Sequence, residues 1–391
     1  MLSSPKVLIL TGSYGNGHLQ VTRTLSETFK RKGINNIVVS DLFLEAHPTL
    51  TSITKSFYIM SYTYGQRLYG LFYYGGNKQS ILSKTAFIHK LGMQKLEEIV
   101  ENEKPDIIVN TFPMLVVPEF RKKKGVTIPI FNILTDFCAH KNWIHEEIDR
   151  YYVATEELKQ DIMNSNVPLS NIRVTGIPIQ PQFEEDLEKQ EILHKYDLKK
   201  DSEVILIIAG AFGVLKDMEE IVAKLSKEHR YQVVVVCGKN EKLRKKLTNR
   251  FLNTPRIKIL GYSNHLYELM SVASIMVTKP GGITLSEALA IKTPLVLYRS
   301  VPGQELENAC YFERKGAAFL VNDPTALIEK ITQITRDSHL QNEMKLNMKK
   351  IHNPNAASVI CTDILQFLEK NPGDHLLEGG SLEYDSISEW G

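Results

Sequence analysis

The sequence predicts an α/β protein made of two Rossmann-like domains. Short apolar runs alternate with helical patterns along most of the chain, which is typical of parallel sheets covered by helices. A polar stretch from Gln180 to Asp201, without buried-strand character, separates two such series. A length of 391 residues is long for one domain and comfortable for two. We therefore expect two parallel sheets whose carboxyl ends face a central cleft, where ligands bind in such folds.

Each expected strand is a run of four to six mostly apolar residues that ends in a polar or glycine-containing turn. Strands buried on both faces have this pattern because helices cover both sides of a parallel sheet. The first half of the chain supplies the runs Val7–Leu10, Ile37–Ser40, Ile107–Asn110, Ile130–Leu134 and Tyr151–Ala154. The second half supplies Val204–Ala209, Gln232–Cys237, Ile257–Leu260, Ile275–Thr278, Leu295–Tyr298 and Ala317–Leu320.

The domain boundaries follow from this series. We place the first domain at residues 1–180 and the second at residues 181–355. A helical pattern from Ala356 to Glu369 comes after the second sheet is complete, so we expect a helix over residues 356–370 that packs back on the first domain. The tail, residues 371–391, contains glycines and acidic residues, and we expect it to be flexible.

Composition narrows the class of protein. A net charge of only +2 gives no bulk electrostatic support to a nucleic-acid role. The four cysteines are scattered without metal-type spacing, which predicts buried thiols in a reducing compartment. The chain enters an apolar strand pattern at Lys6, without the layout of a signal peptide, and no run of about 20 apolar residues predicts a membrane span.

The most informative motif lies between Thr278 and Asn308. Gly281 and Gly282 follow a buried strand and open a helix, and Lys279 and Thr284 flank this turn. A glycine turn at a helix start exposes backbone N–H groups and the positive end of the helix dipole. Such a turn suits a phosphate. Glu287, one turn into the helix, can accept hydrogen bonds from both hydroxyls of a ribose.

Polar side chains also follow the next strand, Pro294 to Tyr298. Gln304, Glu305 and Asn308 stand at an expected helix start, where amide and carboxylate groups can bind the hydroxyls of a sugar. Diphosphate, ribose and sugar together describe a nucleotide-sugar site.

Further strand ends of the second domain carry weaker signals of the same kind. Gly210, Phe212 and Gly213 form a second turn compatible with a phosphate, between a strand and a helix. Lys239 lies at the end of the next strand. Tyr262 lies at the end of a further strand, and backbone groups near it can form hydrogen bonds with the edge of a uracil. Each signal is weak singly, but their regular placement at successive strand ends is specific.

The first strand runs into a turn with Gly12, Gly15 and Gly17, followed by His18. The glycine spacing does not fit a dinucleotide fingerprint, and the turn can simply be tight. His18 opens the first helix above the sheet, where it either points into the cleft or is satisfied by the backbone. The sequence does not choose between these.

Asp136 follows another strand of the first domain. An Asp in this position often caps the next helix. With His140 and Trp143, it can also form an acceptor-side cluster that faces the cleft, in which Asp136 is a general base or orients His18.

The region Ala46–Leu96 contains no Asp or Glu, carries six cations, and has aromatic residues crowded in its middle. Aromatic rings and cations favour an anionic membrane surface, so we expect this region to contact lipid. A helical pair that packs its aromatics on the first sheet is the alternative, and single-stranded nucleic acid is a weaker one. The run Arg121 to Lys124 can extend the basic face or be an ordinary solvated run.

Together these motifs resemble the bacterial processive diacylglycerol β-glucosyltransferases, relatives of the plant monogalactosyldiacylglycerol synthases and of the GlcNAc transferase that makes lipid II. The resemblance covers about residues 6 to 370. It rests on Gly-Ser-Tyr-Gly-Asn-Gly-His before Leu19, Glu45-Ala-His-Pro48 with Leu50-Thr-Ser52, Thr135-Asp136 with His140 and Trp143, Gly210-Ala-Phe-Gly213, Lys279-Pro-Gly-Gly-Ile-Thr284, and Pro302-Gly-Gln-Glu305 with Asn308.

The resemblance implies a GT-B fold, a UDP-sugar donor, an inverting mechanism, no metal ion or other cofactor, and work at the cytoplasmic face of the membrane. It implies transfer of glucose from UDP-glucose to diacylglycerol and then to the glucosyl lipid, as for the glycolipids that anchor lipoteichoic acid. The first domain then binds the acceptor and the membrane, and the second binds the donor. His18 and Asp136 become the candidate catalytic residues. The donor site comprises Gly17, Gly210, Phe212, Gly213, Lys239, Tyr262, Lys279, Gly281, Gly282, Thr284, Glu287, Gln304, Glu305 and Asn308.

Two other functions suit the same fold. A UDP-sugar epimerase needs no lipid surface and leaves the composition of Ala46–Leu96 unexplained. A non-catalytic UDP-sugar sensor binds a protein partner and has no need for His18 and Asp136. The sequence does not distinguish glucose from galactose, and it sets neither the number of sugars added nor the oligomeric state.

Overall fold

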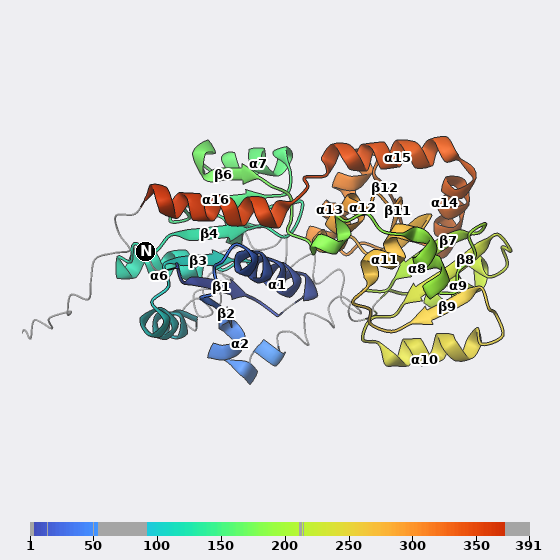
Figure 1. Ribbon diagram of the computed structural model, residues 1–391, viewed down its shortest axis with the longest axis horizontal. Helices are drawn as coiled ribbons and strands as arrows, with labels where there is room; N and C mark the ends of the chain where they lie inside the picture. The colour runs from blue at the N-terminus through green and yellow to red at the C-terminus, as the bar shows by residue number, and fades with distance from the viewer. Residues whose placement is uncertain are drawn as a thin grey trace, which may run out of the picture.

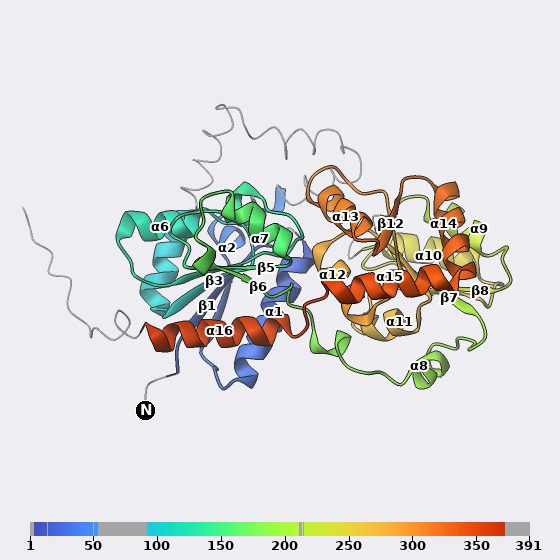
Figure 2. The ribbon, with the colours of Figure 1, turned by 90° about the horizontal axis from the view of Figure 1, so that it is seen from above.

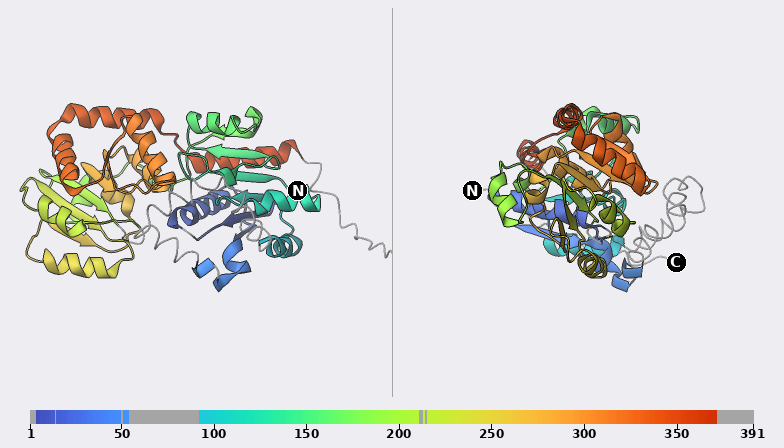
Figure 3. Two further views of the ribbon diagram at one scale, coloured as in Figure 1. Left: turned by 180° about the vertical axis from the view of Figure 1, so that it is seen from behind. Right: turned by 90° about the vertical axis from the view of Figure 1, so that its right-hand side faces the viewer.

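The computed structural model describes residues 4–13, 15–49, 51–53, 92–210, 213 and 215–371. These residues form two α/β lobes that lie side by side (Figure 1). The same two lobes are evident from behind (Figure 3, left). The predicted fold class, two domains with parallel sheets, is therefore confirmed.

The first lobe is built on a six-stranded parallel sheet with the order β2-β1-β3-β4-β5-β6. Every residue of β1 (Val7–Thr11) is buried because helices cover both faces of the sheet. The strand order reverses between β1 and β3, and in parallel sheets such a switch point is where ligands bind, beyond the carboxyl ends of the strands. The strands that follow β1 are β2 (Ile37–Asp41), β3 (Ile107–Asn110), β4 (Ile130–Ile133), β5 (Arg150–Val153) and β6 (Ile172–Val174).

The second lobe repeats this plan with the strand order β12-β11-β10-β7-β8-β9, again all parallel. Its switch point lies between β7 and β10. The turns that the sequence marks for phosphate follow those two strands. The strands are β7 (Glu203–Ile208), β8 (Tyr231–Val236), β9 (Ile257–Leu260), β10 (Ile275–Thr278), β11 (Leu295–Tyr298) and β12 (Ala318–Val321).

The helices pack an apolar face on these sheets. In α1 (Asn16–Arg31), Val21, Leu25 and Phe29 recur every four residues and are fully buried. In the first lobe, α1 is followed by α2 (Leu42–Ala46), α6 (Val116–Lys124) and α7 (Glu156–Met163). The second lobe has α8 (Lys189–Lys195), α9 (Met218–Leu225), α10 (Glu241–Arg250), α11 (Leu266–Val272), α12 (Gly282–Ile291), α13 (Gln304–Arg314), α14 (Pro324–Arg336) and α15 (Ser338–Ile351).

The last helix, α16 (Ala356–Lys370), leaves the second lobe and lies along the first, beside α1 (Figure 2). Asp363 on this helix accepts hydrogen bonds from Arg150 (2.5 Å) and from the hydroxyl of Tyr152 (2.8 Å), both on β5. Phe367 packs edge-on against Phe131 of β4, with ring centroids 5.3 Å apart. The chain therefore crosses between the lobes twice, once before α8 and once before α16.

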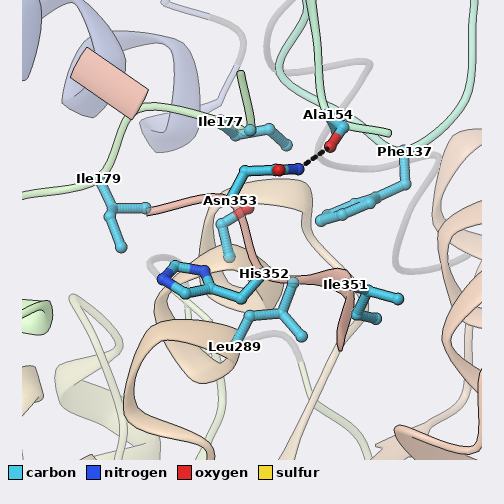
Figure 4. Close-up of a pocket in the computed structure, with 10 residues that line it drawn as sticks. Phe137, Ala154, Ile177, Ile179, Leu289, Ile351, His352 and Asn353 are labelled. Atoms are coloured by element: carbon cyan, nitrogen blue, oxygen red, sulfur yellow. Dashed lines mark hydrogen bonds between the residues drawn. The ribbon is translucent and has the colours of Figure 1, made fainter. Parts of the chain in front are cut away.

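The two crossings meet at a small cavity of about 10 Å³, which has room for one water molecule (Figure 4). Asn353 donates a hydrogen bond to the carbonyl of Ala154 (3.0 Å) beside this cavity. Gly176 has φ +81°, and a Cβ there would lie 2.9 Å from the carbonyl oxygen of Asn353, so the two crossings are in close backbone contact. The cavity is far too small for a nucleotide sugar.

All eleven expected strands are present, with ends that differ by a residue or two. Strand β6 was not predicted, because its three residues include the charged Arg173 and give no apolar run. The expected linker, Gln180 to Asp201, contains no strand and includes the short helix α8. Most of Ala46–Leu96, the residue Phe212 and the tail beyond Asn371 lie outside the described residues.

Candidate active site

His18 lies in the first turn of α1, above the switch point of the first sheet. Its Nδ1 lies 2.7 Å from the carbonyl oxygen of Thr111, at the end of β3, and 3.2 Å from Oγ1 of Thr135. A carbonyl only accepts hydrogen bonds, so Nδ1 carries the proton and Nε2 carries the lone pair. Burial lowers the pKa of His18 to about 4, against the opposing effect of the Thr111 carbonyl. The imidazole is therefore neutral at pH 7 and can accept a proton.

The ring of His18 is held by Phe112, whose ring stands edge-on to it with centroids 5.0 Å apart. Phe112 also fills the space beside Gly12, where a Cβ would lie 2.8 Å from the phenyl ring. The tight glycine turn after β1 thus makes room for the aromatic ring that orients the histidine. Thr111 and Phe112 were not singled out by the sequence, and Thr135 only as part of the Thr135-Asp136 motif, although each lies just past the end of a strand, where the other site residues also lie.

Asp136 follows β4 and reaches across to the second lobe. Its Oδ1 accepts a hydrogen bond from Nδ2 of Asn308 on α13 (2.9 Å), and the backbone N–H of Gly282 also bonds its carboxylate. Burial raises the pKa of the Asp136 carboxyl to about 6, and the negative charge of Glu307 adds to this, while the two hydrogen bonds act in the opposite direction. His18 and Asp136 thus have separate hydrogen-bond partners.

The N-termini of α1 and α12 meet where the two lobes touch. A Cβ on Gly17 would lie 3.0 Å from Cγ1 of Ile283, and a Cβ on Gly282 would lie 2.1 Å from the carbonyl oxygen of Thr135. Only glycine permits the second approach. The structure therefore brings His18 and Asp136 of the first lobe to the glycine turn that the sequence marks for a phosphate.

On the donor side, Glu287 is buried within α12, with only 3% of its surface exposed. Burial alone raises the pKa of its carboxyl to about 8. A carboxyl group in such a place gains most from a ligand that donates hydrogen bonds, as a ribose does. Gly281 is the N-cap residue of the helix, and Thr284 lies in its first turn.

Lys279 and Glu305 form a pair beside this turn. Nζ of Lys279 lies 3.7 Å from Oε2 of Glu305, which also accepts a hydrogen bond from the backbone N–H of Val301 (3.3 Å). Gln304 and Glu305 begin α13, as the sequence indicated for a helix start. The ends of β10 and β11 thus bring Lys279, Gln304, Glu305 and Asn308 to one side of the cleft.

The second glycine turn is tied to the neighbouring strand end. Gly213 has φ +60°, and a Cβ there would lie 2.3 Å from Cβ of Asn240, which donates a hydrogen bond to the carbonyl of Gly213 (3.0 Å). Gly210 also has a positive φ, +82°. Nζ of Lys239 lies 5.7 Å from the centre of the Tyr262 ring, which is 47% exposed.

Two features of the first lobe decide between alternatives that the sequence leaves open. Trp143 is buried in the core (3% exposed) and its carbonyl accepts a hydrogen bond from Asn132, so it does not face the cleft with Asp136. The run from Arg121 to Lys124 closes α6, and its four cations pair with acids of the same lobe. These pairs satisfy the run within the lobe, so it does not extend a free basic face. The acidic partners are Glu97, Glu119, Glu146, Glu147 and Asp149.

Within the described ranges, no cluster of three or more His, Cys, Asp or Glu side chains is arranged to hold a metal ion. In the same part of the chain, every helix is too short or too polar to cross a lipid bilayer.

Comparison with known proteins identifies the family. The model for monogalactosyldiacylglycerol (MGDG) synthase matches residues 18–179, and the model for the glycosyltransferase family 28 C-terminal domain matches residues 204–360. A processive diacylglycerol β-glucosyltransferase from Bacillus licheniformis is 46% identical over 367 residues, which cover 94% of this chain and 96% of that protein. The chain belongs to the processive diacylglycerol β-glucosyltransferase family. A member from Bacillus thuringiensis is 47% identical over 94% of this chain and 95% of its own.

Solved structures support the GT-B fold of this family. MurG from Acinetobacter baumannii superposes with a TM-score of 0.62 at 14% identity, over 93% of this chain and all of that one. MnaA from S. aureus, in complex with UDP, gives a TM-score of 0.63 at 15% identity, over 93% of this chain and 97% of that one. The two-domain architecture expected for a diacylglycerol β-glucosyltransferase is thus confirmed.

Proposed function

We propose that the protein transfers glucose from UDP-glucose to 1,2-diacylglycerol, and then to the glucosyl lipid, to give mono- and then di- or triglucosyldiacylglycerol. The observation that carries this proposal is the meeting of Asp136 and His18, from the first lobe, with the glycine turn of α12 in the second. One side holds groups that can take a proton from a hydroxyl, and the other holds a turn that can bind a diphosphate.

The reaction inverts the anomeric carbon. The acceptor hydroxyl attacks from the face opposite UDP, through an oxocarbenium-like transition state, and its proton passes to Nε2 of His18 or to the carboxylate of Asp136. The bond from the anomeric carbon to the diphosphate oxygen breaks, and UDP leaves with its electron pair. First-turn N–H groups of α12, such as those of Ile283 and Thr284, have no partner within the helix and stabilise the developing negative charge.

The remaining donor residues orient UDP-glucose. Glu287 accepts hydrogen bonds from the ribose, and Gln304 and Glu305 bind hydroxyls of the hexose. A further solved structure of this fold, HepE from Anabaena, is described in complex with UDP-glucose, at a TM-score of 0.55 and 13% identity over 94% of this chain and all of that one. The products serve as membrane glycolipids and as anchors for lipoteichoic acid.

A liposome assay with UDP-[¹⁴C]glucose tests the function. Label that becomes soluble in organic solvent and migrates as glucosyldiacylglycerol supports the transferase. Release of UDP without a labelled lipid indicates an epimerase or hydrolase, and binding of UDP-glucose without turnover indicates a sensor. Parallel reactions with UDP-galactose decide between the two hexoses.

Replacement of Glu287 by Ala should weaken donor binding more than it slows transfer. Hydrogen bonds donated by the ribose favour the ionised form of this carboxyl, and their loss should cost about 1.5–3 kcal/mol, or roughly 10- to 150-fold in the dissociation constant of UDP. Isothermal calorimetry with UDP measures this. Ser286→Ala, on the same helix turn, is the matched control, since its hydroxyl bonds to the carbonyl of Gly282 within the helix. An unchanged affinity for UDP in Glu287→Ala would remove the residue from the donor site.

Transfer should persist when divalent cations are chelated. A helix N-terminus supplies oriented N–H groups and a partial positive charge to a phosphate, and the glycine turn at Gly281 and Gly282 opens α12 in this way. The measurement is the rate of lipid glucosylation in excess EDTA. Loss of activity that manganese or magnesium restores would contradict this assignment.

The protein should bind anionic vesicles more tightly than neutral ones, as a peripheral protein on the cytoplasmic face of the membrane does. The basis is the sequence of Ala46–Leu96, which has six cations and no acid. Each cation near an anionic surface contributes about 1 kcal/mol, and salt weakens this contribution. Vesicle co-sedimentation measures it, with the triple change Phe72→Ser, Tyr73→Ser and Tyr74→Ser as the test of the aromatic part. Unchanged sedimentation with a collapsed melting temperature would show that these rings belong to a core.

A further inference from the structure

The segment that carries Asp136 is docked on the second lobe by its neighbours. Phe137 is 7% exposed, and its ring stacks on Tyr311 (centroids 5.5 Å apart) and meets Phe312 edge-on (4.9 Å), both on α13. The Sγ–H of Cys138 points to the carbonyl of Gln304, at 3.9 Å. Residues 135–138, here called the docking segment, are thus held against the N-termini of α12 and α13.

Asn308 is the polar centre of this contact, with no exposed surface. Its Oδ1 accepts a hydrogen bond from the backbone N–H of Phe137 (2.8 Å), and its Nδ2 donates to Oδ1 of Asp136 (2.9 Å) and to the carbonyl of Pro280 (3.0 Å). The N–H of Phe137 can only donate and the carbonyl of Pro280 can only accept, so the orientation of the amide is determined. Both N–H bonds of the amide are in use.

The carboxylate of Asp136 is therefore held from the opposite lobe. Its partners are Nδ2 of Asn308 and the backbone N–H of Gly282, and both belong to the second lobe although Asp136 belongs to the first. A carboxylate bound this way has a fixed position only while the lobes are in contact. The sequence suggested that Asn308 binds the hexose, but both N–H groups of the amide are already in use, so a hexose hydroxyl could reach it only by donating to the second lone pair of Oδ1.

We propose that Asn308 is a positioning residue for Asp136: from the donor lobe, it holds the acceptor-side carboxylate in place and in its ionised form once the lobes have closed. This inference rests on the proposed function, in which Asp136 takes part in proton removal. The carboxylate of the first lobe is then held in its working position by a residue of the domain that binds the donor.

The charged groups around Asp136 determine in which direction each substitution should shift the pKa of its carboxyl. On α13, Glu307 lies next to Asn308 and raises the pKa of the Asp136 carboxyl by repulsion. Lys279, just past β10, pairs with Glu305 in the first turn of α13, and His18 approaches from α1 through Thr135. A hydrogen bond donated to a carboxylate favours its ionised form. Removing that bond raises the pKa, and removing the charge of Glu307 lowers it.

The experiment compares Asn308→Leu with Glu307→Gln by the pH dependence of lipid glucosylation. Leu has a similar size but cannot donate. Asn308→Leu should lower kcat about tenfold or more, with KM for UDP-glucose changed less than about threefold, and should move the acid limb of the profile to higher pH. Glu307→Gln, the neighbouring control, should move that limb to lower pH. Asn308→Ser, which leaves a small polar side chain, replaces the Leu variant if that variant does not fold.

Three outcomes would overturn the proposal. A raised KM for UDP-glucose with an unmoved acid limb would make Asn308 a hexose ligand. A lower melting temperature with unchanged kcat and an unmoved limb would make it a structural residue only. A shift of the acid limb to lower pH in Asn308→Leu, or to higher pH in Glu307→Gln, would contradict the action of Asn308 on Asp136. Failure of the proposed function itself is distinct, because the wild-type protein would then label no lipid at any pH.

Discussion

Replacement of His18 by Ala, or of Asp136 by Asn, should lower lipid glucosylation by about 10²- to 10⁴-fold, the usual loss when a general base is removed. Neither change should weaken the binding of UDP, because all the proposed donor groups except Gly17 belong to the second lobe, and neither change alters Gly17. Asp161→Asn, an exposed acid on α7, is the matched control and should keep its activity. If either variant loses UDP binding while its fold is preserved, that residue belongs to the donor site.

The pH profile decides which of the two takes the proton. A base must be unprotonated, so activity falls as the pH drops through its pKa. Burial sets the pKa of His18 at about 4 and that of the Asp136 carboxyl at about 6. An acid limb near pH 6 in kcat/KM for the free enzyme identifies Asp136 as the group whose ionisation limits the rate. A rate that stays constant down to about pH 5 leaves His18 as the base, with Asp136 not required in its ionised form.

A double variant tests whether the residues act as a unit. His18 bonds to Thr111 and Thr135, and Asp136 bonds to Asn308 and Gly282, so the structure gives them no shared hydrogen bond. We expect the two losses to add less than fully, since one proton is removed and one missing group already limits the step. Full additivity in free energy would mean that the two residues contribute to different steps.

The fold was accessible from the sequence because parallel strands are buried on both faces and therefore form apolar runs. Strands β1 and β8, with every residue buried, are clear examples. Strand β6 could not be predicted from the sequence, since it lies at the edge of its sheet and its middle residue is Arg173. Edge strands need fewer apolar residues, so their pattern is weak.

The candidate site could be predicted from the sequence only in part. Strand ends at a switch point gather functional groups in any parallel sheet, which is why His18, Asp136 and Glu287 could be singled out. The contacts that give them their properties join distant parts of the chain. Asn308 and Asp136 are 172 residues apart, and their bond depends on how the lobes dock. No periodicity or local motif encodes that relation, and for the same reason the sequence left open a place in the cleft for Trp143, which lies in the core.

Gly282→Ala should be the most damaging small substitution at the contact between the lobes. Its Cβ would lie 2.1 Å from the carbonyl oxygen of Thr135 and 3.0 Å from Oδ1 of Asp136. A backbone carbonyl cannot rotate away as a long side chain can, so the docking segment must move off α12. Strain of this kind typically costs about 1–3 kcal/mol, which corresponds to a change of up to about 150-fold in an equilibrium constant. Here the strain displaces Asp136 from its position. Glucosylation should therefore drop by about 10²-fold.

The neighbouring Gly281→Ala separates this cause from the phosphate-binding role of the turn. Gly281 has φ −73°, which any residue adopts, and a Cβ there would meet nothing within 4 Å. Both variants keep every backbone N–H; alanine favours the helix at position 282, whereas at the N-cap position 281 it is somewhat less favourable than glycine. If lobe docking is what requires glycine, Gly281→Ala loses far less activity than Gly282→Ala, and only the latter increases the radius of gyration in small-angle scattering. Equal losses in both variants, with unchanged scattering, would mean instead that the glycine pair is needed for close approach of the diphosphate.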